Sequence, residues 1–367
     1  MKPIKSLQFQ VEKNKFINHA IEEIPEENLT LATDEIIVKV DLFSFTSNNI
    51  TYAVSGEIIR YWEFFPPVGK QTEGWGVIPV WGFADVVESK ADNIPVGDRL
   101  FGYFPPPSHL KMKAGHITGK RFIDVSEHRS TLPPTYNLYR RVLSEPNYDQ
   151  KLDRDRALFY PLYITSFCLW DSLQENNWFG AEQTIILSAS SKTSIGLAYG
   201  LHIDETAPNA IGITSERNLE AVVKLGLYDE VYTYDQLAQI NSTIPTVIVD
   251  MSGNNVVLVD LHKRLGDLMK FTFKVGLTHW KESNPNEGII RERSKFFFAP
   301  SHIQKRIEDW GASEFDQKTG QFLVDAVATT KAWLQYKTLD GLADLATVYP
   351  MVCNGILAAD QGLIVKM

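Results

Sequence analysis

Cysteine is scarce in this chain, since Cys168 and Cys353 are the only two among 367 residues. Two thiols cannot build a framework of disulfides, and so few in a long chain indicate a reducing compartment. The cysteines and histidines lack the short, repeated spacing of a zinc site, so we expect no metal. A chain of this length can bury a large core without such staples.

The chain also lacks a net positive charge and long apolar runs. The net charge is −9, whereas binding to nucleic acid or to a membrane surface needs dense Lys and Arg. No run approaches the roughly 18 apolar residues of a membrane span, and residues 1–13 lack the apolar core of roughly 7–15 residues that a signal peptide needs. We therefore expect a cytoplasmic protein with neither nucleic acid nor membrane as a partner.

The first 150 residues are rich in strand signals. Residues 35–43 and 77–87 mix β-branched and polar residues as strands do, and a Gly-Asp-Arg turn leads into another strand at 100–103. Prolines cluster at 66–67 and 105–107, which marks loops. Many short strands with turn signals indicate a β-barrel or a sandwich.

The pattern changes after about residue 150 to alternating helices and strands. Short apolar runs predict buried strands, and the segments around them predict helices; the strands are 183–187, 209–214, 231–234, 246–250 and 270–276, and the helices 157–174, 195–201, 215–225 and 256–265. This alternation indicates an α/β domain with a doubly wound parallel sheet, as in Rossmann domains.

A dinucleotide site needs a strand, a tight turn and a helix N-terminus, and residues 188–196 lie at such a junction. The usual G-x-G-x-x-G would place glycines at 191, 193 and 196, where Ser191, Thr193 and Gly196 stand. The retained glycine is the one that lets helix and strand pack closely. The small hydroxylic replacements can still approach phosphate, and the candidates for cofactor contact are Ser190, Ser191, Lys192, Thr193 and Gly196.

Two other interpretations of this turn stay open. One is a plain capped helix, with a residue between Ser188 and Ser194 as its N-cap. The other is a phosphate loop of the G-x-x-x-x-G-K-[ST] type ending at Lys192 and Thr193, but both of its glycines are missing.

The next strand ends in Thr214 and Ser215, followed by Glu216 and Arg217. NAD enzymes usually place an acidic residue at this strand end to hold the ribose 2′-hydroxyl. Hydroxyls and a guanidinium suit a 2′-phosphate instead, so we expect NADP, with NAD less favoured. The alternative is an exposed helix start capped by Ser215.

In sequence order, these motifs resemble the medium-chain dehydrogenase/reductase superfamily, and within it the zinc-free quinone oxidoreductase branch. The segments that carry the resemblance are 35–40, 51–56, 97–102, 225–234, 249–253 and 355–365. Residues 276–280 and 296–302 are most similar to a divergent group, DUF2855. The resemblance implies a GroES-like barrel domain over 1–150, completed by about 335–367, and a Rossmann domain over 151–334.

The resemblance also implies site residues and an assembly. Tyr52 would face the nicotinamide and donate a proton or hydrogen bond to a bound carbonyl, helped by Asn48. Tyr234 and Ser252 would contact the cofactor, and His279 would lie beside the nicotinamide as a substrate contact. A homodimer is expected by analogy with this fold.

Tyr136 and Tyr139 form a polar, aromatic group with Arg140 in an unusual insertion. They are candidates to line the substrate site, although a surface helix would explain their spacing equally well. Hydrolase chemistry has no support, because no Ser/His/Asp order or paired carboxylates stand out in the sequence.

The sequence therefore predicts an NADP(H)-dependent, metal-free reductase of a quinone, an enone or another activated small-molecule carbonyl. Because its glycine turn is degenerate, the alternative is a nucleotide-binding protein that has lost turnover. A third hypothesis is that the α/β domain binds an adenosyl donor. The lack of an acidic residue at the end of the second strand of this domain, 209–214, disfavours this hypothesis.

Overall fold

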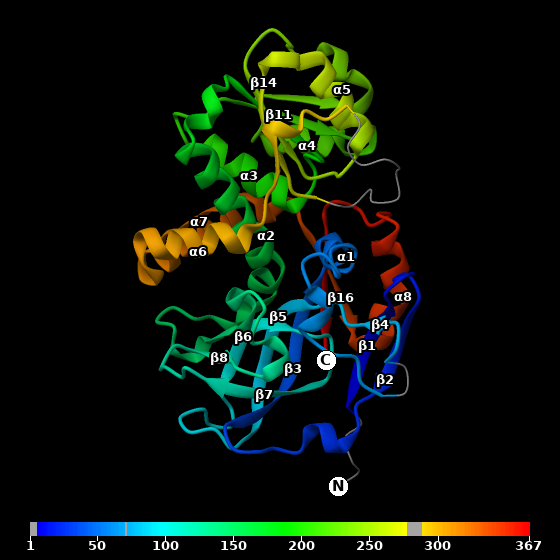
Figure 1. Ribbon diagram of the computed structural model, residues 1–367, viewed down its shortest axis with the longest axis vertical. Helices are drawn as coiled ribbons and strands as arrows, with labels where there is room; N and C mark the ends of the chain where they lie inside the picture. The colour runs from blue at the N-terminus through cyan, green and yellow to red at the C-terminus, as the bar shows by residue number, and fades with distance from the viewer. Residues whose placement is uncertain (1–5, 70–71, 277–287) are drawn as a thin grey trace. The chain divides into compact units, whose positions relative to one another are not determined.

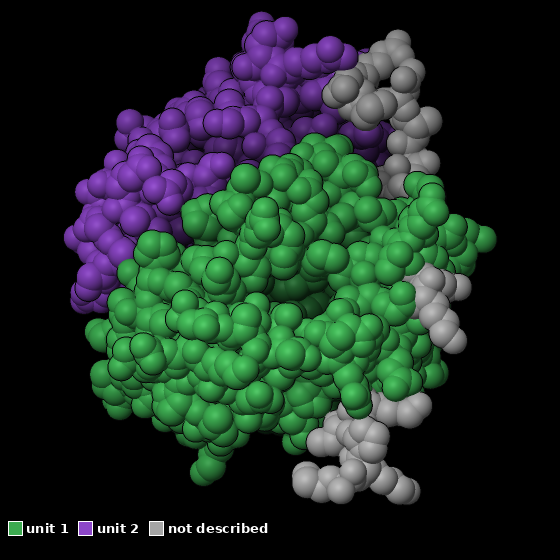
Figure 2. All heavy atoms as spheres, turned by 60° about the horizontal axis from the view of Figure 1, so that its bottom comes forward, with its two compact units in different colours: residues 1–158, 335–367 green, residues 159–334 purple. Residues whose placement is uncertain are grey.

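The computed structural model describes residues 6–69, 72–276 and 288–367. The chain forms two compact units (Figures 1 and 2). Unit 1 comprises Met1–Leu158 and Gln335–Met367, and unit 2 comprises Phe159–Leu334.

Unit 1 is built on a closed antiparallel barrel. Its strands are β3 (Glu35–Phe45), β5 (Val80–Ser89), β6 (Arg99–Phe104), β9 (Leu138–Arg141), β8 (Arg121–Asp124) and β7 (His109–Gly115), and β7 pairs back onto β3. Register irregularities at Ile37/Val38 and Val40/Leu42 bend β3, as bulges do in barrels. The predicted barrel is confirmed, and it closes where β7 pairs with residues Glu35–Lys39 of β3.

Further elements of unit 1 surround the barrel. A parallel pair, β16 (Gln335–Asp340) and β17 (Gln361–Lys366), joins the sheet where β17 runs antiparallel to β3. A small sheet contains β2 (His19–Glu23), β1 (Leu7–Glu12) and β4 (Trp75–Gly76), and two helices, α1 (Ser47–Val54) and α8 (Gly341–Cys353), complete the unit.

Unit 2 is a doubly wound parallel sheet, as the sequence predicts. The strands lie in the order β12 (Glu230–Thr233), β11 (Asn209–Thr214), β10 (Gln183–Leu187), β13 (Thr246–Asp250), β14 (Met269–Lys274) and β15 (Ser294–Phe296). The direction of winding reverses at β10, because β11 and β13 flank it on opposite sides. In such sheets ligands bind at the carboxyl ends of the strands beside this reversal.

Six helices belong to the part of unit 2 that the structure describes: α2 (Asp153–Glu175), which begins in unit 1, α3 (Lys192–His202), α4 (Leu219–Leu225), α5 (Asn255–Leu265), α6 (Ala299–Trp310) and α7 (Ala312–Thr330). The predicted helix over 215–225 is shorter, because a 3-10 turn, Glu216–Asn218, precedes α4. β15, α6 and α7 were not predicted from the sequence.

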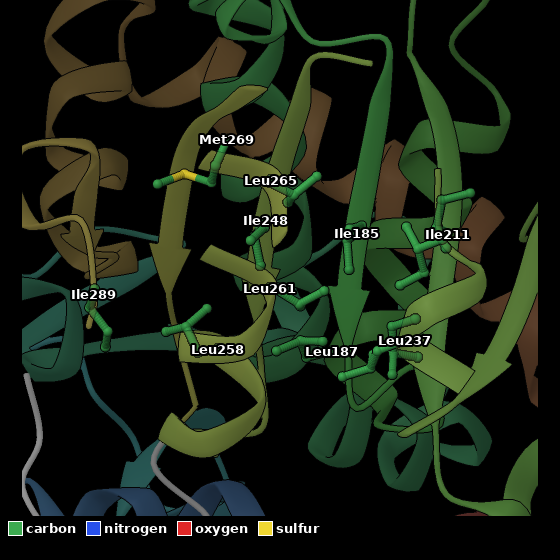
Figure 3. Packing of buried hydrophobic residues seen from close by; sticks show 12 residues of the cluster. Ile185, Leu187, Ile211, Leu237, Ile248, Leu258, Leu261, Leu265, Met269 and Ile289 are labelled. Carbon is green, nitrogen blue, oxygen red and sulfur yellow. The ribbon is translucent and has the colours of Figure 1, made fainter. Parts of the chain in front are cut away.

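One hydrophobic core of unit 2 lies between the sheet and α5 (Figure 3). Ile185 and Leu187 alternate along β10 and point to the same face. Leu258, Leu261 and Leu265 of α5 recur at helical spacing and pack onto that face. Full burial of an aliphatic side chain contributes about 1.5–3 kcal/mol, so this layer holds the strand ends in fixed positions.

Candidate functional site

The turn after β10 is a capped helix N-terminus. Ser188 adopts a left-handed conformation, with φ of 59°, which a non-glycine residue enters at a cost. Ser191 is the N-cap of α3, and its hydroxyl accepts a hydrogen bond from the Ser194 amide at 3.2 Å. The Ser188 amide donates to the Tyr234 hydroxyl at 3.1 Å. The capped-helix interpretation is therefore correct for Ser191, and the cap lies where the dinucleotide interpretation needs a helix N-terminus.

Gly196 serves a different contact from the one that the sequence motif predicts. A Cβ atom at this position would lie 2.6 Å from the Ser166 hydroxyl and 2.7 Å from the Tyr163 ring. Both residues belong to α2, so the glycine permits close packing of two helices rather than of a helix on a strand. The Ser166 hydroxyl also donates to the Thr193 carbonyl oxygen at 2.8 Å.

Lys192 is the first residue of α3, and its ammonium lies 5.7 Å from the centre of the Trp333 ring. A cation–π contact of this length holds the charge near the helix N-terminus. Ser190 lies in the same turn and accepts a hydrogen bond from the Asn218 side chain at 3.0 Å. The turn after β10 and the segment after β11 are thereby joined.

At the end of β11, polar atoms are buried without a protein partner. Thr214 is 1% exposed, and the hydroxyls of Thr214 and Ser215 have no hydrogen-bond partner among the described residues. Ser215 precedes the 3-10 turn without capping it through its side chain, and Arg217 lies in that turn with an exposed side chain. A buried hydroxyl without a partner costs about 1–3 kcal/mol, so these groups are suited to a ligand.

Asp250 ends β13 and is fully buried. Its Oδ1 atom accepts hydrogen bonds from the Ser252 amide, the Ser252 hydroxyl and the Gly253 amide, at 2.8, 2.7 and 3.0 Å. Its Oδ2 atom is buried without a partner in the described part of the chain. Burial raises the pKa of Asp250, against the effect of the Ser252 hydrogen bonds.

Ser252 is among the site residues predicted from the sequence, whereas Asp250 is not. The Ser252 hydroxyl donates to Asp250, so it orients the carboxylate. An acidic residue directly after an apolar strand was the available signal, because the carboxyl ends of parallel strands meet at the ligand-binding edge.

Tyr52 of unit 1 lies in α1 and is buried. Burial raises the pKa of Tyr52 to about 12, while hydrogen bonds to Trp81 and Asn48 act in the opposite direction. Its phenol is therefore protonated at neutral pH and can donate a hydrogen bond. Asn49, its neighbour in α1, has a structural role because its amide donates to the Pro79 carbonyl oxygen at 2.8 Å.

Tyr136 and Tyr139 are both buried, so the surface-helix interpretation is wrong. Tyr136 lies in a 3-10 helix and Tyr139 in β9. The Tyr136 hydroxyl shares a 2.8 Å hydrogen bond with that of Tyr61, whose ring also packs against Tyr52. The Tyr139 hydroxyl is occupied by the Tyr103 carbonyl oxygen and by Arg129. His279 and Trp280 lie outside the described residues.

No helix in the described ranges is long and apolar enough to cross a membrane. Within the same ranges, no group of three or more His, Cys, Asp or Glu side chains could hold a metal ion.

Residues 43–358 match the sequence profile of a family described as "Protein of unknown function (DUF2855)". The chain belongs to the DUF2855 family. No curated protein matches it. The predicted resemblance to this group is therefore confirmed.

Solved structures resemble this DUF2855 protein over nearly the whole chain. An enoyl thioester reductase from Candida tropicalis is 13% identical, with 99% of this chain and 100% of that chain covered and a TM-score of 0.57. A protein from Bacillus thuringiensis that is described as an NADPH:quinone reductase is 11% identical, with 99% of both chains covered and a TM-score of 0.59. CurA from Vibrio vulnificus, solved with NADPH, is 12% identical, with 98% of this chain and 99% of that chain covered and a TM-score of 0.58. These matches show that the DUF2855 chain has the medium-chain dehydrogenase/reductase fold.

Proposed function

We propose that this DUF2855 protein is an NADP(H)-dependent reductase of a conjugated carbonyl compound that needs no metal. The observation that carries the proposal is the set of unpaired buried atoms at the carboxyl edge of the unit 2 sheet: Thr214 Oγ1, Ser215 Oγ and Asp250 Oδ2. The N-terminus of α3 lies at the same edge. Solved structures of the same fold include complexes with NADP and NADPH, which supports the proposal.

The residues of unit 2 fit a dinucleotide. The N-terminus of α3, with Lys192 at its first position, is suited to the pyrophosphate, because helix N-termini and positive charge attract anions. Ser190, Ser191 and Thr193 line the same turn and would contact phosphate oxygens or approach them closely. When bound, NADPH supplies the hydride for the reduction.

The end of β11 favours NADP over NAD. Thr214 and Ser215 stand where an acidic residue would repel a 2′-phosphate, and their hydroxyls have no other partner among the described residues. Arg217 follows in the next turn and would bind the 2′-phosphate through its guanidinium.

Asp250 would bind a different part of the cofactor. A carboxylate oxygen only accepts hydrogen bonds, so Oδ2 is unsuited to a phosphate and suited to a ribose hydroxyl. Ser252 orients this carboxylate by donating a hydrogen bond to Oδ1. The Tyr234 hydroxyl accepts a hydrogen bond from the Ser188 amide, so it lies near the same carboxyl ends of the strands.

Tyr52 is the proposed donor to the substrate carbonyl. A phenol whose pKa is raised to about 12 keeps its proton, so it stabilises negative charge on the carbonyl oxygen by donating a hydrogen bond. Asn48 would keep the phenol in position through its side-chain hydrogen bond.

A titration with NADPH, followed by the quenching and blue shift of its fluorescence, tests the cofactor site. Thr214→Val should weaken NADPH binding about fivefold to tenfold, since the loss of a ligand hydrogen bond is worth about 1 kcal/mol. Thr184→Val is a matched control, because the Thr184 hydroxyl is also buried and unpaired but lies inside β10. Equal effects of the two variants, or no binding of NADPH at millimolar concentration, would refute the proposed site.

A second candidate function is nucleotide binding without turnover. The observation that favours it is that two donors of the turn, the amides of Ser188 and Ser194, are already engaged by Tyr234 and Ser191. Protein that binds NADPH but reduces no member of a panel of quinones and enals would establish this alternative and exclude the reductase.

A further inference from the structure

The turn after β10 begins with a residue in a strained conformation. Ser188 has a φ of 59°, a left-handed value that glycine adopts freely and other residues adopt at a cost in free energy. Such conformations persist only where the surrounding structure holds them in place. Other groups of unit 2 must therefore keep Ser188 in this conformation.

One of these groups is the phenol of Tyr234, the first residue of the 3-10 helix that follows β12. The Ser188 amide donates a hydrogen bond to the Tyr234 hydroxyl at 3.1 Å. The same hydroxyl forms a hydrogen bond with the side chain of Ser252, which donates to Asp250 at the end of β13. Tyr234 thus ties the strained residue to the neighbouring strand end.

A second group is the phenol of Tyr228, which lies just before β12 and donates a hydrogen bond to the Ala189 carbonyl oxygen at 2.9 Å. Its ring reaches the turn because Gly212 of β11 has no side chain. A Cβ atom at Gly212 would lie 2.9 Å from the Tyr228 ring and 3.1 Å from the Ala189 Cβ atom. A glycine inside a strand weakens the strand and often marks the close approach of another group, which here is the Tyr228 ring.

The two phenols bind consecutive residues of the turn, the amide of Ser188 and the carbonyl of Ala189. Backbone hydrogen bonds complete the arrangement, since the Ala189 amide donates to the Ile213 carbonyl oxygen at 2.9 Å and the Ser191 amide to the Ser188 carbonyl oxygen at 2.8 Å. Donors held in fixed positions bind a ligand more tightly, because less freedom is lost on binding. Side chains therefore fix the backbone that leads into the N-terminus of α3.

We propose that Tyr228 and Tyr234 are positioning residues of the cofactor site, which hold residues 188–191 in the shape that receives the pyrophosphate of the dinucleotide. The phenols would take the place of the glycines that this turn lacks at 191 and 193. Tyr234 acts through Ser188 in this arrangement, without touching the cofactor. The inference rests on the cofactor binding of the proposed function and deepens it.

Fluorescence titration of the full-length protein with NADPH tests the proposal. Tyr228→Phe and Tyr234→Phe each remove one hydroxyl and keep the ring, so each should weaken NADPH binding about fivefold. Tyr232→Phe is the matched control, because Tyr232 lies between them in β12 and its hydroxyl donates to Glu230, away from the turn. It should leave the affinity unchanged.

Two results of this titration would overturn the proposal. One is an NADPH affinity in Tyr228→Phe and Tyr234→Phe equal to that of the control. The other is tighter binding in Tyr234→Phe, which would mean that the phenol competes with the cofactor for the Ser188 amide. If Tyr228→Phe fails to fold, Tyr234→Phe carries the test alone, with the same weakening expected and the same results against it.

Tyr234→Phe in a Ser188→Gly background tests the mechanism. Glycine adopts the left-handed conformation without strain, so the Tyr234 hydroxyl should matter less there. We expect its removal to weaken NADPH binding less than about twofold in this background, compared with about fivefold in the natural one. A hydroxyl that contacted NADPH, or that merely stabilised unit 2, would give equal losses in both backgrounds, and equal losses would reject the positioning role.

Hydrogen exchange of the cofactor-free protein separates this inference from the proposed function. The Ser188 amide should exchange faster in Tyr234→Phe than in Tyr232→Phe, because its acceptor is removed. Faster exchange in a protein that does not bind NADPH would reject the cofactor site and keep the phenols as the groups that shape the turn. Unchanged exchange in a protein that binds NADPH would keep the cofactor site and reject the role of the phenols.

Discussion

Two arginines of unit 1 are buried in ion pairs, whereas unit 2 keeps a buried carboxylate oxygen and two buried hydroxyls unpaired at one edge of its sheet, among the described residues. Arg129 is completely buried and bonds to Asp124 at 2.8 Å, and Arg99 bonds to Asp153 at 2.7 Å. Thr214 and Asp250 of unit 2 each keep one buried oxygen without a partner in the described chain. We infer two uses of buried polarity: paired charges stabilise the fold, and the unpaired atoms at this strand edge are suited to a ligand.

The largest expected effect breaks a buried pair in unit 1. Arg129→Ala leaves Asp124 as a buried charge without its counterpart, so we expect a loss of about 3–5 kcal/mol in the free energy of unfolding, measured in urea. The control is Arg264→Ala, which removes an exposed pair with Asp260 and should cost about 0.5 kcal/mol. Similar losses in the two variants would mean that the buried pair does not stabilise unit 1.

The pH dependence distinguishes the two units. His262 of unit 2 is buried, and burial lowers its pKa to about 4. Its Nδ1 atom accepts a hydrogen bond from the Ile290 amide, and its Nε2 atom forms a hydrogen bond with the Thr272 hydroxyl. The unfolded chain takes up this proton near pH 6.5 and the folded chain only near pH 4. Unit 2 should therefore lose up to about 3 kcal/mol as the pH falls through that window.

Four buried tyrosines of unit 1 have the opposite effect on stability, because burial raises their pKa values: Tyr52, Tyr61, Tyr103 and Tyr136. Unit 1 should therefore lose stability as the pH rises above about 10. Hydrogen exchange resolved by unit, from pH 4 to 11, checks both trends. His262→Gln should flatten the acid slope of unit 2; an unchanged slope would show that another group is responsible.

Gly196 tests the helix contact beside the turn after β10. Gly196→Ala places a methyl group 2.6 Å from the Ser166 hydroxyl, so we expect a loss of about 1–3 kcal/mol from overpacking. Gly320→Ala is the matched control, because Gly320 lies in α7 and a Cβ atom there would meet nothing within 4 Å. Removal of a helical glycine should stabilise unit 2 by about 0.5–1 kcal/mol. The thermal midpoints should thus move in opposite directions, and a common direction would contradict the packing argument.

The smallest effect concerns cofactor choice. Arg217→Ala should weaken NADPH binding about tenfold, or about 1.4 kcal/mol, and leave NADH binding unchanged, because only NADPH carries the 2′-phosphate. Fluorescence titrations with both cofactors measure this. Equal losses for the two would remove Arg217 from the 2′-phosphate site.

Sequence patterns predict the two architectures well and the sites less completely. Apolar runs such as 183–187 and 246–250 fix strand positions because a parallel strand is buried on both faces. The strand end at Asp250 was visible in the sequence, but the unpaired state of its Oδ2 atom depends on every neighbour in space. Tyr103 and Tyr61 join Tyr52 only because the closed barrel brings distant segments together, which no local pattern records.

The pairing of β17 with β3 has a consequence for the order of synthesis. The ribosome delivers all six barrel strands first, the whole of unit 2 next, and β16 and β17 last. Until β17 arrives, residues 42–45 of β3 lack its hydrogen bonds and present an unpaired strand edge. Exposed edges of this kind recruit other chains, so a premature stop just before β17 would release a nearly complete protein that is prone to aggregate.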